Sequence, residues 1–328
     1  MQVPVIDISA FLDPLADAAA RAKVAREWEL AFSTLGFANV VGHGVEPELI
    51  AAARQAAFAF FDLPAQVKTG CSFGGEKTSQ GYLQVGSETV SKTFEKEGAA
   101  PPPDLVETLT FAFVDWERDG PLSDFERSIF RPNRWPAQPE GASATFRTYY
   151  EAVYRLGLVL MQISAAALKL PDGFFDAYYG RMATSLRLAH YPAQQERPLA
   201  GQLRYGPHTD YMGYTILLQD EQHGGLQVLG AENTWVDVQP MPGAFTVNCG
   251  DLLSRWTNTH WNSNIHRVVN PPPESAATRR LSIVMFTGPD YQAEISCLPT
   301  CATPENPARF ASIPCWDHFQ EKVRASLS

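Results

Sequence analysis

His208 and Asp210 stand two residues apart and carry the kinds of side chain that bind metal ions. The residues that follow, 214–218, are aromatic, β-branched or aliphatic, which is typical of a buried strand. Residues i and i+2 of an extended chain point to one face, so this imidazole and carboxylate can reach a common point while Thr209 faces away. Such a pair also occurs by chance on protein surfaces, and a metal site needs a third ligand.

His266 is the best candidate for that ligand, since it opens a short Val-rich run that Pro271 stops. Two histidines and one carboxylate on one face of an octahedron leave three open positions, as in non-haem Fe(II) oxygenases. His260 is the rival, because it also precedes a turn.

A second pattern concerns an anion. Arg280 and Ser282 lie in an apolar run, where the strand period puts both on one face. A buried guanidinium is costly unless it is paired with an anion, and guanidinium and hydroxyl together suit a carboxylate. Arg279, one residue earlier, is expected to face outward. A structural salt bridge would explain the same arginine.

These residues, taken in order, resemble the plant- and fungal-type 2-oxoglutarate/Fe(II) dioxygenases of the isopenicillin N synthase-like superfamily. The resemblance rests on His208-x-Asp210, His266 and Arg280-x-Ser282. Further segments that look like family landmarks run through most of the chain: Val3–Ile8, Leu35–Gly44, Phe58–Pro64, Gly81–Tyr82, Asn133–Pro136, Leu186–Pro192 and Val247–Asp251.

The resemblance implies a metal site, a cosubstrate and a reaction. His208, Asp210 and His266 would hold Fe(II), which 2-oxoglutarate would chelate, with its far carboxylate on Arg280 and Ser282. Tyr191 would lie near that carboxylate, although Ala189 stands where the family often has asparagine. With O2, the products would be CO2, succinate and a small molecule oxidised at a C–H bond by hydroxylation, desaturation or ring closure.

Two other functions fit the same residues. An iron oxidase like isopenicillin N synthase would use the Arg-x-Ser pair for the substrate's own carboxylate and would take no 2-oxoglutarate. A non-catalytic β-barrel with a structural metal would use the same three ligands, but it would not need Arg280 inside.

Composition limits the partners and the compartment. The net charge is −10 and the Lys and Arg residues are scattered, which argues against a nucleic-acid surface. No apolar run is long enough to span a bilayer. Five cysteines without a signal-peptide pattern predict reduced thiols and a cytoplasmic protein.

The periodicity changes from helical to strand-like along the chain. We expect a helix-rich N-terminal region, 1–140, and a β-rich catalytic region, 141–328, that form one integrated unit. The fold expected is mainly β with flanking helices, a distorted double-stranded β-helix (jelly roll) supported by an N-terminal α/β region. Helices are predicted at 18–35 and 145–170, and a C-terminal one at 313–327 that covers the pocket.

Loops and aromatic residues suggest where a substrate would bind. The stretch 71–103 reads as exposed loop, and 92–103 within it as a mobile lid. Apolar pocket walls are expected from four aromatic residues, each of which has an equally good role in packing: Tyr82, Phe111, Trp256 and Phe286. A further strand is predicted at 291–299.

Overall fold

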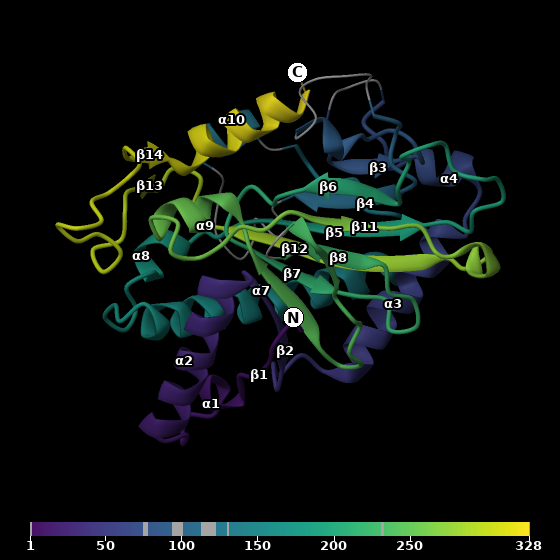
Figure 1. The fold of residues 1–328 in the computed structure, drawn as a ribbon. Coiled ribbons are helices and arrows are strands. Elements are labelled where there is room, and N and C mark those ends of the chain that lie inside the picture. The colour runs from purple at the N-terminus through teal and green to yellow at the C-terminus, as the bar shows by residue number, and fades with distance from the viewer. Residues whose placement is uncertain are drawn as a thin grey trace.

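The computed structural model describes residues 2–74, 78–93, 101–112, 123–129, 131–230 and 233–327. Two β-sheets lie in the middle of the molecule, and the helices α2, α3 and α7 gather on one side of them (Figure 1). None of the helices in these described ranges is long and apolar enough to cross a membrane.

The larger sheet has eight strands in the order β1-β2-β10-β7-β12-β5-β4-β3. Their bounds are Val5–Asp7 (β1), Phe37–Val41 (β2), Gly81–Leu83 (β3), Glu107–Ala112 (β4), Ala183–Tyr191 (β5), Tyr214–Leu218 (β7), Phe245–Cys249 (β10) and Arg280–Gly288 (β12). The N-terminal region therefore supplies strands at both ends of this sheet, and the β-rich region supplies the four in the middle.

The smaller sheet has four strands in the order β6-β11-β8-β9. Their bounds are Tyr205–His208 (β6), Leu226–Leu229 (β8), Trp235–Asp237 (β9) and His266–Val268 (β11). Apolar residues from both sheets meet in one cluster, which includes Phe37, Leu217, Val228 and Val268. Two facing sheets with helices behind one of them are the predicted double-stranded β-helix.

Of the helices, α2, α3 and α7 cover the outer face of the larger sheet, while α10 lies on the opposite side of the molecule (Figure 1). The bounds of the helices are Ser9–Leu12 (α1), Ala18–Thr34 (α2), Pro47–Phe61 (α3), Ala65–Thr69 (α4), Asp124–Ile129 (α6), Ala142–Ala167 (α7), Asp176–Tyr179 (α8), Asp251–Trp256 (α9) and Cys315–Leu327 (α10), with short 3-10 turns at Val90–Thr93 (η1) and Pro273–Ser275 (η3). The helix α7 forms because apolar residues recur at helical spacing, and it buries that stripe against the sheet.

Two sequence-based expectations need correction. The predicted exposed loop at 71–103 contains β3, which buries Tyr82, because these residues pair with β4 and extend the sheet at its edge. The strand expected at 291–299 is reduced to Glu294–Ile295 (β13), which pairs with Ile313–Pro314 (β14). Most of the predicted lid, residues 94–100, lies outside the described residues.

Candidate functional site

His208, Asp210 and His266 come together in the space between the sheets. Their potential ligand atoms all lie within 4.8 Å of one another. The Nε2 atom of His208 is 3.8 Å from Asp210 Oδ1, and Nε2 of His266 is 3.6 Å from Asp210 Oδ2. His208 ends β6 and His266 begins β11, and the antiparallel pairing of these strands puts the two histidines directly opposite each other.

Backbone carbonyls fix the tautomer of both imidazoles. The Nδ1 atom of His208 lies 2.9 Å from the Gly206 carbonyl oxygen, and Nδ1 of His266 lies 3.1 Å from that of Asn264. A carbonyl only accepts, so each Nδ1 carries the proton and each Nε2 keeps its lone pair. Both lone pairs are thus available to one metal ion, as in protein metal centres whose outer contacts orient the histidines.

The Asp210 carboxylate is held from two neighbouring strands. Its Oδ2 accepts hydrogen bonds from the Thr215 hydroxyl on β7 (2.5 Å) and from the Asn248 amide on β10 (2.6 Å). Sequence reasoning did not predict either contact. Thr215 and Asn248 are directly opposite each other in the β7–β10 register, which is why both reach the same oxygen.

The protonation states of His208 and Asp210 also favour metal binding. Burial, followed by the neighbouring His266, lowers the pKa of His208 to about 3, so its imidazole is neutral at physiological pH. Burial alone would raise the pKa of Asp210, but the two imidazoles and its hydrogen bonds outweigh that effect and lower it. Neutral imidazoles and an ionised carboxylate are the forms that bind metals.

Arg280, Ser282 and Tyr191 form a second group on the same inner face. The Arg280 side chain is fully buried, and its Nη1 donates to Ser282 Oγ at 2.6 Å while its Nε donates to the Gly224 carbonyl at 3.0 Å. Its guanidinium carbon lies 5.1 Å from the centre of the Tyr191 ring. The buried Nη2 has no hydrogen-bond partner among the described residues. An unpaired, buried N–H of a cation fits the carboxylate of a bound ligand.

The strand register identifies what else faces this space. Val284 and Phe286 follow Ser282 at every second position of β12, and both are only half-buried. Opposite Val284 on β5 lies Arg187, which binds both carboxylate oxygens of Glu88. The inner face therefore carries apolar side chains, Val284 and Phe286, beside the ion pair of Arg187 with Glu88.

The other expected pocket aromatics lie elsewhere. Tyr82 and Phe111 point to the opposite face of the sheet, and with Trp256 they are buried in the core that packs against the helices. Of the four aromatics only Phe286 faces the site. The rival ligand His260 is also remote, since it is half-exposed and hydrogen-bonds to Glu29 in α2.

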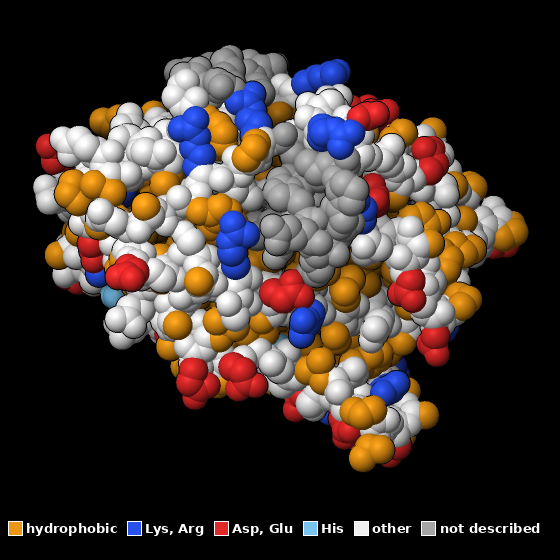
Figure 2. All heavy atoms as spheres, turned by 180° about the vertical axis from the view of Figure 1, so that it is seen from behind, with side chains coloured by type: hydrophobic (Ala, Val, Ile, Leu, Met, Phe, Trp, Pro, Cys, Tyr) orange, Lys and Arg blue, Asp and Glu red, His pale blue; other side chains and the backbone are white. Residues whose placement is uncertain are grey.

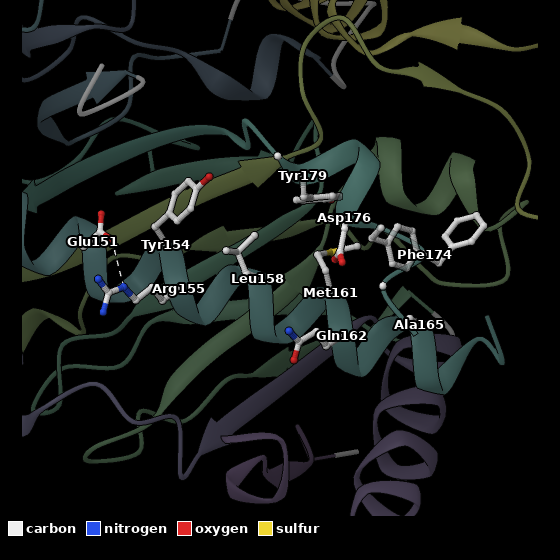
Figure 3. A pocket seen from close by; sticks show the side chains of 13 residues that line it. Glu151, Tyr154, Arg155, Leu158, Met161, Gln162, Ala165, Phe174, Asp176 and Tyr179 are labelled. Carbon is white, nitrogen blue, oxygen red and sulfur yellow. Dashed lines mark hydrogen bonds and ion pairs between the residues drawn. The ribbon is translucent and has the colours of Figure 1, made fainter. Parts of the chain in front are cut away.

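A hollow of about 480 Å³ on the helical side contains none of the proposed site residues. It lies between α7 and α8, where Leu158, Met161 and Phe174 line it and the ion pair of Glu151 with Arg155 stands at one end (Figure 3). The chemistry proposed below belongs to the space between the sheets.

Two family models match the chain. Residues 183–289 match the 2OG-Fe(II) oxygenase superfamily, and residues 3–138 match the non-haem dioxygenase in morphine synthesis N-terminal family. The first match contains all six candidate site residues: Tyr191, His208, Asp210, His266, Arg280 and Ser282.

Similar proteins cover nearly the whole chain. The 2-oxoglutarate-Fe(II) type oxidoreductase hxnY of Emericella nidulans is 33% identical over 98% of this chain and 90% of its own length. A solved 2OG-Fe(II) oxygenase family protein of Caulobacter crescentus has a TM-score of 0.83 and 31% identity, covering 98% of both chains. A full-length Neurospora crassa protein, solved in complex with alpha-KG and thymine, has a TM-score of 0.83 at 27% identity, covering 98% of this chain and 96% of the other. The chain therefore belongs to the 2OG-Fe(II) oxygenase superfamily, and it is a non-haem dioxygenase that uses Fe(II), 2-oxoglutarate and O2.

Proposed function

We propose that His208, Asp210 and His266 hold the iron, and that Arg280, Ser282 and Tyr191 bind the far carboxylate of 2-oxoglutarate. The observation that carries this proposal is the combination of three convergent ligand atoms with a buried guanidinium that has an unpaired N–H on the same inner face. A structural metal would not require that guanidinium.

The bound iron and cosubstrate supply O2 activation, coupled to oxidation of 2-oxoglutarate to succinate and CO2. The residues of the chain hold and orient these groups. Gly206 and Asn264 carbonyls fix the imidazoles, Thr215 and Asn248 fix the carboxylate, and Arg280 with Ser282 fixes the direction in which the cosubstrate lies. Such preorganisation places reacting groups without further cost during turnover.

We propose that the substrate is a small molecule oxidised at a C–H bond, with hydroxylation as the default outcome and desaturation or ring closure as variants. Asp210 disfavours halogenation, because its carboxylate takes the position that a halide would need. Phe286 would contact an apolar part of the substrate, and Arg187 with Glu88 would contact polar groups. The thymine in the Neurospora structure supports a substrate of this size.

We also propose that the protein acts in the cytoplasm without a nucleic-acid or membrane partner. On the face shown in Figure 2, Lys and Arg side chains occur singly, with acidic and apolar side chains between them. This pattern supports the expectation from the net charge of −10. The five cysteines are all free thiols, which supports a reducing compartment.

An anaerobic titration tests the proposed function. Adding 2-oxoglutarate to the Fe(II)-loaded protein should produce a charge-transfer absorption, and admitting air with substrate should release succinate. If neither appears at saturating 2-oxoglutarate, the assignment of the cosubstrate site to Arg280, Ser282 and Tyr191 is wrong.

A further inference from the structure

Arg204 is a buried arginine that the proposed function has not used. It stands directly before β6, only 2% of its surface is exposed, and it lies four residues from the metal-site histidine His208. Its Nη2 donates to the Thr278 carbonyl at 2.5 Å, while its buried Nε has no hydrogen-bond partner among the described residues. A buried guanidinium with an unpaired N–H costs free energy until an acceptor binds it.

The Arg204 guanidinium lies at the start of β12, because the Thr278 carbonyl that it binds is two residues before Arg280. Burial, and second the positive charge of Arg280, lowers the pKa of Arg204 to about 10, while Tyr191 and Asp220 act in the opposite direction. The same tyrosine and the same aspartate act on Arg280. Both guanidiniums are therefore buried at the start of β12, and each has one nitrogen without a hydrogen-bond partner among the described residues.

The protein groups around these arginines do not balance their charge. Among the residues that the structure describes, Asp220 is the carboxylate that acts on both, and its oxygens already accept from the backbone of Leu281, Gln222 and His223. The two guanidinium charges of Arg204 and Arg280 and the one negative charge of Asp220 add up to a net charge of +1. A second carboxylate in this region would neutralise it and would satisfy the unpaired N–H groups.

We infer that Arg204 binds the far carboxylate of 2-oxoglutarate together with Arg280. The inference rests on the proposed function, which places that carboxylate at Arg280. Two guanidiniums on one carboxylate would favour a dicarboxylic oxo acid over an oxo acid with an apolar end. Arg204 thereby becomes a residue that determines cosubstrate specificity.

A structural role for Arg204 predicts a different result. Its bond to Thr278 lies two residues before Arg280, so it could simply hold the start of β12 in place. If the role of Arg204 is purely structural, its substitution would weaken the binding of all oxo acids equally, or would leave the binding of all of them unchanged. A lost contact with the far carboxylate would weaken only oxo acids that carry one.

The experiment compares two ligands in Arg204→Gln. The probes are 2-oxoglutarate and 2-oxovalerate, which has the same five-carbon chain but a methyl group in place of the far carboxylate. Dissociation constants come from anaerobic titration of the Fe(II) protein, so no turnover is needed. We expect 2-oxoglutarate to bind roughly 10- to 100-fold more weakly, as for a lost charge-assisted hydrogen bond, with 2-oxovalerate unchanged.

Three further variants make the result decisive. Arg279→Gln removes a neighbouring charge that is half-exposed and paired with Asp62, and it should leave both constants unchanged. Arg204→Lys keeps the charge without the planar fork and should bind 2-oxoglutarate with intermediate affinity; it also carries the test if Arg204→Gln does not fold. Arg280→Gln should weaken 2-oxoglutarate binding alone.

The outcomes separate the inference from the function on which it rests. If Arg280→Gln weakens 2-oxoglutarate while the Arg204 variants leave it unchanged, or weaken both ligands equally, the role of Arg204 is structural and the inference is wrong. If Arg280→Gln also leaves 2-oxoglutarate binding unchanged, the proposed cosubstrate site itself is wrong.

Discussion

At the residue scale, Asp210 depends on contacts made by its neighbours. The Asn248 amide donates to Oδ2 from β10 in the larger sheet. Asn248→Ala should therefore reduce Fe(II) affinity roughly 10- to 100-fold, as is typical when an outer contact of a metal ligand is removed. Direct Fe(II) titration of the folded variant measures this, and Thr215→Val should act in the same direction. An unchanged affinity in both variants would mean that these bonds do not orient the carboxylate.

The third proposed metal ligand, His266, gives a second prediction at this scale. His266→Ala should abolish Fe(II) binding because it removes one of three convergent ligand atoms. His260→Ala is the matched control, since that imidazole is half-exposed and bonded to Glu29. Metal content after anaerobic loading distinguishes them. Equal iron in the His266 variant and the parent would exclude His266 as a ligand.

Local periodicity explains which residues could be predicted. His208 with Asp210, and Arg280 with Ser282, follow from the period of two in a strand, which is a local property. The contact of Asn248 with Asp210 depends on which strands become neighbours, and a single sequence does not contain that information. The burial of Arg204 could not be predicted from the sequence either, because a lone arginine before a strand is usually exposed.

At the element scale, Asp104 joins a turn to β6, the strand that carries the proposed metal ligand His208. Its two carboxylate oxygens accept from the backbone N–H of Val90 in η1 and of Gly206 in β6, both at 2.8 Å. Burial, the largest influence, raises the pKa of Asp104 to about 6. Because Glu88 lies just before η1 and binds Arg187, this connection also positions the polar wall of the site.

The raised pKa of Asp104 predicts how stability depends on pH. The folded protein holds this proton more tightly than the unfolded chain, whose aspartates titrate near pH 4. The contribution of Asp104 to the free energy of unfolding should therefore fall as pH rises from about 4 to about 6, by about 3 kcal/mol in total.

Asp104→Asn isolates this contribution, because asparagine does not titrate. The difference in unfolding free energy between the parent and Asp104→Asn, measured with urea from pH 4 to 7, should decrease as pH rises. A difference that stays constant over this range would show that Asp104 has an ordinary pKa.

Elements differed in how well their sequences predicted them. The helix α7 is long and strongly periodic, and its predicted range of 145–170 agrees with Ala142–Ala167 within a few residues. The strand β3 was missed because its three residues stand in a polar, Gly-rich stretch and form a strand only by pairing with β4. Short edge strands depend on their partner more than on their own sequence.

At the scale of the whole molecule, a buried ionic group connects the two regions of the chain. Glu107 on β4 accepts from Lys68 on α4 at 2.7 Å and from the Tyr82 hydroxyl on β3 at 2.6 Å, and its other oxygen lies 2.8 Å from His190 Nδ1 on β5. We propose that residues 1–140 and 141–328 therefore unfold as one unit. The N-terminal strands at both ends of the larger sheet support this proposal.

Lys68→Met tests that proposal. It leaves the Glu107 carboxylate without its cation in a site where the two side chains are only 11% and 7% exposed. Loss of one partner of a buried ion pair typically costs ~3–5 kcal/mol. Lys23→Met is the matched control, since Lys23 and Glu27 are 69% and 40% exposed, and it should change stability by less than ~1 kcal/mol. In the Lys68 variant, far-UV circular dichroism and tryptophan fluorescence should shift together in one transition. Two separate transitions, of which only one shifts, would show that the regions unfold independently.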